Sequence, residues 1–177
     1  MTGAAVFLDR DGVLNRAIVR DGRPYPPANV AELEVPDEVP EAVERLRKAG
    51  FALVVVTNQP DVARGTQSRA VVDAINAELG KRLGIYDFRV CYHDDSSHCE
   101  CRKPGAGLLL AAARDLDLDL TRSFMVGDRW RDVEAGRRAG CRTVLIDNNY
   151  REPLKTEPDV RVRNLAEAAS WILEKCR

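Results

Sequence analysis

The sequence predicts an α/β protein in which a parallel β-sheet is covered by helices on both faces. Short apolar runs rich in β-branched residues alternate with longer stretches that have the apolar spacing of amphipathic helices. Polar side chains directly follow several of the apolar runs, as they do where parallel strands lead into a ligand site. No internal repeat or low-complexity segment interrupts the alternation, and 177 residues suffice for one domain with a proper core.

The expected elements follow one another along the chain. A helix capped by Asp37 stops at Gly50, another begins at Ser68, and a last one is capped by Asn164. The segment Arg16–Pro36 holds four of the nine prolines and has no clear period, so a long ordered loop is expected there. Strands are expected at 4–8, 51–56, 88–92, 123–126 and 143–146, and two further helices at 108–116 and 133–139.

Composition excludes several classes of function. A net charge of −1 provides no field that would attract nucleic acid or an anionic membrane. The apolar runs are too short to span a membrane, and no signal peptide is visible, so a cytoplasmic location is expected. Of the five cysteines, Cys91, Cys99 and Cys101 fall within eleven residues, whereas Cys141 and Cys176 stand alone. An odd number with one tight cluster favours metal binding over a disulfide framework.

Polar residues mark the carboxyl ends of four predicted strands. Asp9 follows the first, Thr57 follows the second, Cys91 and His93 end the third, and Asp128 follows the fourth. Ligands of open parallel sheets bind beyond the carboxyl ends of the strands, where the strand order reverses. The sequence therefore predicts one site at this edge of the sheet.

Asp9 and Asp11 lie two residues apart, just past a buried strand. Two such carboxylates repel each other unless a cation or a proton holds them, and magnesium, which prefers oxygen ligands, fits Asp9 together with a backbone carbonyl. A magnesium-bound carboxylate beside a phosphate can attack in line and form an aspartyl phosphate. The alternative is a turn with two solvated aspartates, which the preceding strand and the following Gly12 make less favourable.

The Thr57-Asn58-Gln59 and Arg102-Lys103 motifs fit phosphate chemistry, although each has a simpler interpretation. A hydroxyl and backbone N–H groups at a strand end are good donors to phosphoryl oxygens, but Thr-Asn also opens many turns. Two adjacent cations can hold a dianionic phosphate and its transition state, but such a pair is commonly a solvated surface feature.

A second pair of carboxylates ends the fourth strand. Asp128 could complete the magnesium shell, and Asp132, four residues on, could orient the waters of the ion. The alternative is an aspartate that caps a helix.

Taken together, the motifs Asp-x-Asp-Gly-Val, Thr-Asn-Gln, Arg-Lys-Pro and Gly-Asp-x-x-x-Asp resemble those of the haloacid dehalogenase (HAD) superfamily of phosphatases. The segments Phe7–Asn15, Phe51–Gly65, Cys91–Pro104 and Met125–Gly136 closely resemble the D-glycero-D-manno-heptose bisphosphate phosphatases and their relatives, the histidinol-phosphate phosphatases. The resemblance covers roughly the first 150 residues and is faint beyond them. It implies a three-layer Rossmann-like parallel sheet in the order 3-2-1-4-5, within one HAD-like domain over residues 1–177 and without a large cap domain.

The resemblance also implies the role of each residue. Asp9 would be the nucleophile, and Asp11 would be the general acid and base, with its backbone carbonyl on magnesium. Asp128 would complete the magnesium ligands, with Asp132 orienting the waters. The residues expected at the phosphoryl group and the substrate are Thr57, Lys103, Asn58, Gln59, Arg102 and Arg129.

A closed structural zinc site is expected in the loop 91–103. Cys91, His93, Cys99 and Cys101 supply three thiolates and one imidazole, and similar loops before Arg-Lys-Pro are typical of the family. The alternative is a loop of free thiols. Zinc would fold the loop that delivers the two cations of the Arg-Lys-Pro motif.

The favoured function is a magnesium-dependent phosphomonoester hydrolase that removes one phosphate, at C7, from D-glycero-D-manno-heptose 1,7-bisphosphate. A histidinol-phosphate phosphatase, or another phosphatase of small metabolites, stays open because the catalytic residues read only the phosphate. A phosphoryl-accepting signalling domain is the alternative of another class, but Asp11 argues against it because it would hydrolyse the phospho-aspartate. The expected partner is a small phosphorylated sugar or similar metabolite, and the expected state is a monomer. Arg129 and the proline-rich loop Arg16–Pro27 depart from the heptose pattern and would influence substrate choice.

Overall fold

The fold was analysed in a computed structural model that describes residues 3–176. Its central sheet has six parallel strands in the order β5-β4-β1-β6-β7-β8. These are β1 (Ala5–Leu8), β4 (Ala52–Asn58), β5 (Asp87–Cys91), β6 (Phe124–Gly127), β7 (Arg142–Ile146) and β8 (Val160–Val162). The first five strands confirm the predicted order 3-2-1-4-5.

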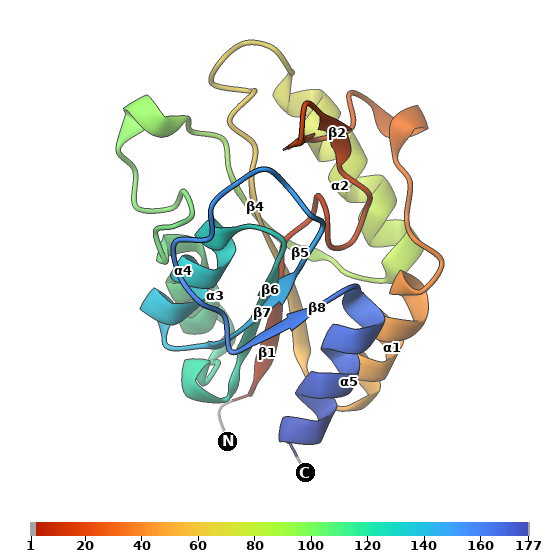
Figure 1. The fold of residues 1–177 in the computed structure, drawn as a ribbon, viewed down its shortest axis with the longest axis vertical. Helices are drawn as coiled ribbons and strands as arrows, with labels where there is room; N and C mark the ends of the chain where they lie inside the picture. The colour runs from red at the N-terminus through yellow and green to blue at the C-terminus, as the bar shows by residue number, and fades with distance from the viewer. Residues whose placement is uncertain (1–2, 177) are drawn as a thin grey trace.

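Five helices cover the two faces of the sheet (Figure 1). They are α1 (Val39–Lys48), α2 (Arg69–Leu83), α3 (Gly107–Leu116), α4 (Trp130–Ala139) and α5 (Leu165–Lys175). Alternate residues of β1 belong to two separate cores: Val6 and Leu8 pack with α1, α2 and α5, whereas Ala5 and Phe7 pack with α3 and α4. Because neighbouring side chains of a strand point to opposite faces, this division establishes the three-layer architecture.

A small hairpin lies where the sequence predicted a long loop. The strands β2 (Ile18–Arg20) and β3 (Arg23–Tyr25) pair in antiparallel fashion, and a 3-10 turn follows at Val30–Glu32. Asp21 and Gly22 at the turn both have positive φ angles, 51° and 75°. Two such residues match the right-handed twist of a tight hairpin, and Asp-Gly is the sequence signal for it. The prediction of a long ordered loop at Arg16–Pro36 was wrong for this part of the segment, because its prolines drew attention away from the Asp-Gly turn signal.

The structure differs from the prediction at two further places, one strand and one helix cap. The strand β8 was not predicted, because it has only three residues and lies at the edge of the sheet, where no buried run marks it. The N-cap of α1 is Glu38 rather than Asp37, it makes no side-chain capping bond, and a proline occupies the first turn. Ser68 and Asn164 do cap α2 and α5 as expected, each accepting a backbone N–H bond.

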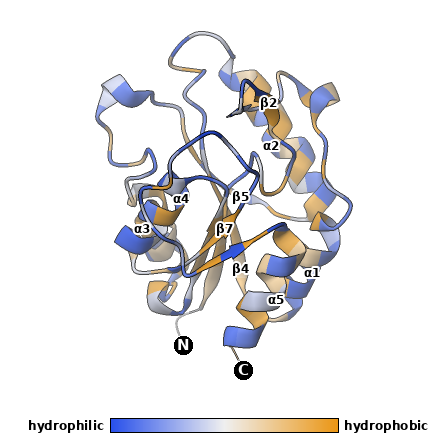
Figure 2. Ribbon diagram, in the orientation of Figure 1, coloured by the Kyte–Doolittle hydropathy of each residue, from blue (hydrophilic) through white to orange (hydrophobic). Residues whose placement is uncertain are grey.

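The loops that follow the strands gather at one end of the molecule, and both ends of the chain lie at the other (Figure 1). The strands of the central sheet are largely hydrophobic, whereas the loops beyond their carboxyl ends are mostly hydrophilic (Figure 2). Across residues 3–176, no helix is long and apolar enough to cross a membrane. The predicted domain, 1–177, includes residues 1, 2 and 177, which lie outside the described residues.

Candidate active site

Asp9 begins the site at the end of β1. The backbone N–H of Asp9 donates to the Val126 carbonyl of β6 at 2.9 Å, so the residue continues the sheet, and it is 8% exposed. One oxygen of its carboxylate, Oδ1, accepts from the Lys103 ammonium at 2.9 Å. The predicted nucleophile therefore lies on a rigid strand end and faces a cation.

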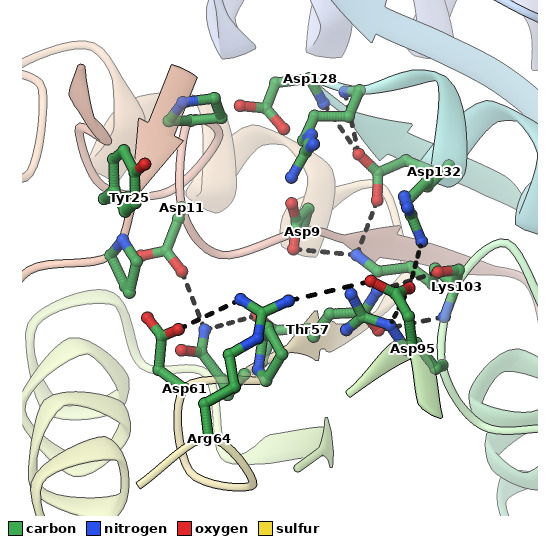
Figure 3. A pocket seen from close by; sticks show the side chains of 18 residues that line it. Asp9, Asp11, Tyr25, Thr57, Asp61, Arg64, Asp95, Lys103, Asp128 and Asp132 are labelled. Carbon is green, nitrogen blue, oxygen red and sulfur yellow. Dashed lines mark hydrogen bonds and ion pairs between the residues drawn. The ribbon is translucent and has the colours of Figure 1, made fainter. Parts of the chain in front are cut away.

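Lys103 is almost completely buried and is fixed at both ends. Its ammonium also contacts Asp132 Oδ1 at 2.7 Å (Figure 3). It donates to the Val56 carbonyl at 2.7 Å as well. The Asn58 side chain binds the Lys103 backbone in both directions, with two hydrogen bonds of 3.0 Å. Burial lowers the pKa of Lys103, but Asp132 and Asp9 raise it by more, so Lys103 stays charged.

Asp132 is held by backbone as well as by Lys103. Its Oδ2 accepts from the N–H groups of Asp128 and Arg129 at 3.2 and 3.0 Å, as in a capping box. The N-cap residue of α4 is thus Arg129, so the simpler interpretation of Asp128 as a helix cap does not apply. Gly127 makes this turn possible, because a Cβ there would lie 2.1 Å from the Cβ of Asp132.

The geometry of the carboxylates fits a divalent cation. Asp9, Asp128 and Asp132 can each present an oxygen atom within 4.8 Å of the others. Both oxygens of Asp132 are already bonded, whereas Asp128 Oδ1 is buried and has no hydrogen-bond partner among the described residues. Burial, and then the charges of Asp9 and Asp132, raise the pKa of Asp128 well above its usual range. A hard cation with oxygen ligands would relieve this repulsion.

Burial also raises the pKa of Asp9, from 3.8 to about 6, with Lys103 opposing and Asp132 and Asp11 adding to the shift.

A folded-state pKa above the unfolded value stabilises the protein at low pH, and this stabilisation is lost as the pH rises through the folded pKa. Without added divalent metal, we expect the free energy of unfolding of the wild type to fall relative to that of Asp9→Asn between about pH 4 and 6, by an amount on the order of 3 kcal/mol at neutral pH. Denaturant unfolding of both proteins across this range measures the difference.

Asp115→Asn is the matched control for this measurement. Asp115 is exposed, and its bond to Arg89 lowers its pKa, so its contribution to stability has the opposite sign. A difference between wild type and Asp9→Asn that stays constant with pH would contradict the raised pKa of Asp9.

Asp11 is clamped by three side chains. Arg10 donates to both of its oxygens at 3.2 and 3.0 Å, Asn15 to Oδ1 at 3.0 Å and Gln59 to Oδ2 at 2.8 Å. Arg10 is fully buried, and its other guanidinium nitrogen donates to Asn76 of α2 at 2.8 Å. Arg10 and Asn15 were not predicted as site residues, because a polar or charged residue beside a motif carries no sign in the sequence that it is buried.

The side chains of Asn58 and Gln59, which were predicted to bind substrate, are engaged by the protein in the structure. The Asn58 amide holds the Lys103 backbone, and the Gln59 amide bonds both Asp11 and Thr57 Oγ1. Both residues still line the cavity, as does the buried Thr57. Their direct contact with a substrate stays a prediction.

A cavity of about 240 Å³ opens in front of Asp9 and Lys103. Pro24 and Tyr25 of the hairpin form part of one wall. Three arginines lie around Asp95 in the same cavity, with nitrogen–oxygen distances of 3.0 Å from Arg102, 3.1 Å from Arg131 and 3.8 Å from Arg64 (Figure 3). Arg129 also lines the cavity, but its guanidinium is paired with Glu152 at 2.7 and 2.8 Å.

The four predicted zinc ligands converge in the loop after β5. Among the thiols, the Sγ–Sγ distances are 3.7 Å for Cys91–Cys99 and 3.3 Å for Cys91–Cys101 and Cys99–Cys101. His93 Nδ1 lies 3.5 Å from Cys91 Sγ and 3.3 Å from Cys101 Sγ. Zinc–sulfur bonds of about 2.3 Å in a tetrahedral site require sulfur atoms slightly under 4 Å apart. The Cys91–Cys99 distance matches this value and the other two are shorter, so the four side chains could hold a zinc ion after a small adjustment, whereas Cys141 and Cys176 lie outside the cluster.

Comparison with known proteins identifies the family. A family model described as HAD-hydrolase-like matches residues 100–168. A D-glycero-D-manno-heptose-1,7-bisphosphate 7-phosphatase of Thermosynechococcus vestitus is 34% identical, over 97% of this chain and 96% of that protein. The D-glycero-beta-D-manno-heptose-1,7-bisphosphate 7-phosphatase of Photorhabdus laumondii is 37% identical, over 88% and 85% of the two chains. The chain belongs to the HAD-like heptose-bisphosphate phosphatase family.

A solved structure of the same family has the same fold. The D,D-heptose 1,7-bisphosphate phosphatase from B. bronchiseptica, complexed with magnesium and phosphate, superposes with a TM-score of 0.84 at 30% identity, covering 97% of this chain and 99% of that one. The present chain is accordingly a phosphatase of the HAD-like family.

Proposed function

We propose that this HAD-like phosphatase removes the C7 phosphate of D-glycero-D-manno-heptose 1,7-bisphosphate through an aspartyl phosphate on Asp9. The observation that carries the proposal is the buried Lys103, which joins Asp9 to Asp132 at the floor of a cavity bordered by arginines. The heptose-bisphosphate phosphatases that match the chain over most of its length support the choice of substrate.

In the proposed mechanism the reacting phosphate binds between Asp9 and Lys103. An Asp9 oxygen attacks phosphorus, and the bond from phosphorus to the sugar oxygen breaks while Asp11 gives that oxygen a proton. Asp11, now a carboxylate, takes a proton from water, whose oxygen attacks the aspartyl phosphate and releases inorganic phosphate. Lys103 and the Thr57 hydroxyl stabilise the charge on the phosphoryl oxygens.

Asp9, the Asp11 carbonyl and Asp128 would hold magnesium, with Asp132 orienting its waters. Bound there, the ion would neutralise the phosphate and align it for in-line attack. Arg10, Asn15 and Gln59 bond both oxygens of the Asp11 carboxylate and so orient it, and one of these contacts has to give way when Asp11 carries the proton that it donates.

The arginines around Asp95 suit the second phosphate of a bisphosphate. Three guanidinium groups face the two carboxylates of Asp95 and Asp61, which leaves one net positive charge at this side of the cavity. Arg102 can form a bidentate contact with an anion, which lysine cannot reproduce. A histidinol phosphate has no second anion to place there, so this group of side chains favours the heptose bisphosphate.

Arg102→Ala tests the assignment of the second phosphate. We expect kcat/KM for the bisphosphate to fall about 10- to 100-fold, as for loss of a charge-assisted hydrogen bond, with little change for heptose 7-phosphate or histidinol phosphate. Phosphate release from the three substrates measures the preference, and Arg114→Ala on the exposed surface of α3 serves as control. Equal losses on all substrates would instead assign Arg102 to the reacting phosphate. A wild type that prefers histidinol phosphate would overturn the proposed substrate.

We also propose a structural zinc ion on Cys91, His93, Cys99 and Cys101, supported by their spacing, which would shape the 91–103 loop before Arg102. A single domain, a cytoplasmic location and a monomeric state remain predictions for this chain.

A further inference from the structure

The segment after β7, residues 147–152, contacts the proposed metal ligand Asp128. The Tyr150 hydroxyl donates to Asp128 Oδ2 at 2.7 Å. The Asn148 side-chain amide lies 3.4 Å from the same oxygen and 3.1 Å from the Tyr150 hydroxyl, and it donates to the Gly12 carbonyl at 3.0 Å. Two side chains of this segment therefore converge on one oxygen of Asp128.

Gly12 closes the space around that oxygen. Its φ angle is +85°, and a Cβ at this position would lie 1.8 Å from Asp128 Oδ2 and 2.8 Å from the Tyr150 hydroxyl. Only a glycine allows the loop after Asp9 to pass so close. Asp128 Oδ2 is thus enclosed by Gly12 on one side and Tyr150 on the other.

Further contacts fix the segment on either side of the site. The Arg151 N–H donates to the Gly22 carbonyl in the hairpin turn at 3.0 Å. Glu152 pairs with Arg129 and accepts from the Trp130 indole N–H at 3.1 Å. Because the backbone next to Tyr150 is anchored both to the hairpin and to α4, its hydroxyl has a defined position.

The two oxygens of Asp128 are consequently unequal. Oδ2 is taken by Tyr150 and Asn148, whereas Oδ1 has no partner in the described part of the chain. We propose that Tyr150 is a positioning residue for magnesium: its hydroxyl holds Oδ2 and thereby keeps Oδ1 directed at the cation. The inference rests on the metal site of the proposed function. Groups that orient a metal ligand contribute to metal affinity even though they do not touch the ion.

Tyr150→Phe tests the inference, since it removes the hydroxyl and keeps the ring. We expect the dissociation constant for Mg²⁺, measured by calorimetric titration of the protein without substrate, to rise about 10- to 100-fold. The stabilisation of the thermal transition by Mg²⁺ should fall accordingly, while the transition without Mg²⁺ changes little. Asn148→Ala should weaken Mg²⁺ binding in the same direction by a smaller factor, because its contact with Oδ2 is longer.

Tyr92→Phe is the matched control. The Tyr92 hydroxyl also donates to an aspartate, Asp73 at 2.6 Å, but it does so on an exposed helix surface. The Tyr92→Phe substitution should therefore leave Mg²⁺ binding unchanged. If wild type and Tyr150→Phe bind Mg²⁺ equally well while Asp128→Asn abolishes binding, the positioning role of Tyr150 is overturned and the metal site stands. Unchanged binding in Asp128→Asn would overturn the metal site itself, and the inference with it.

Discussion

Asp9→Asn is expected to abolish phosphatase turnover, by about 10⁴-fold or more, while the fold survives. An amide has nearly the size of the carboxylate but is a far poorer nucleophile and magnesium ligand. Asp9 sits at the end of β1, where its backbone bond to β6 does not depend on the side chain. Steady-state release of phosphate from the heptose bisphosphate measures the loss, and circular dichroism checks the fold.

Asp11→Asn should behave differently, and the contrast tests the mechanism. Proton transfer by a positioned acid is typically worth about 10²–10⁴-fold, and the second step needs the same group as a base. We expect this variant to accumulate a phospho-enzyme from a substrate with a good leaving group, whereas Asp9→Asn forms none. Asp115→Asn, the same substitution at an exposed aspartate that does not line the cavity, is the control and should retain full activity. Near-normal turnover in Asp9→Asn would show that metal-activated water attacks phosphorus directly.

The second large effect is expected for Cys101→Ala. Its thiol is central to the proposed zinc cluster, with both other thiols at 3.3 Å and His93 Nδ1 at the same distance. Loss of this ligand should release zinc and unfold the 91–103 loop, because structural zinc provides the folding free energy of such loops. Activity should fall about 10- to 100-fold through misplaced Arg102 and Lys103.

Metal analysis and hydrogen exchange of the loop check this expectation. Cys176→Ala, the same substitution at an exposed thiol outside the cluster, should keep one zinc per chain and full activity. Wild-type protein that contains no zinc when purified without chelator would contradict the assignment. Loss of zinc from Cys101→Ala without any loss of activity would separate the loop from catalysis.

The sequence by itself determined the sheet and the edge at which the site lies. The buried runs of β1, β4 and β6 have strong apolar patterns, and the residues that follow them, Asp9 and Asp128 among them, must meet at one edge because the strands are parallel. The cysteine cluster was equally local, since its four ligands fall within eleven residues. Elements with weak sequence patterns were not predicted: β8 has only three residues, and the hairpin lies in a proline-rich segment without clear alternation.

Only the tertiary structure decided which group each polar side chain contacts. Lys103 reaches Asp9 across 94 residues, Arg10 reaches Asn76 across 66, and Tyr150 reaches Asp128 from the next strand connection. Periodicity tells which face of an element is buried, but a hydrogen-bond partner depends on how crossover connections bring distant segments to the same strand ends. The bond of Gln59 to Asp11, the bonds of Asn58 to Lys103 and the enclosure of Asp128 by Gly12 and Tyr150 are consequences of that packing, and no local spacing in the sequence encodes them.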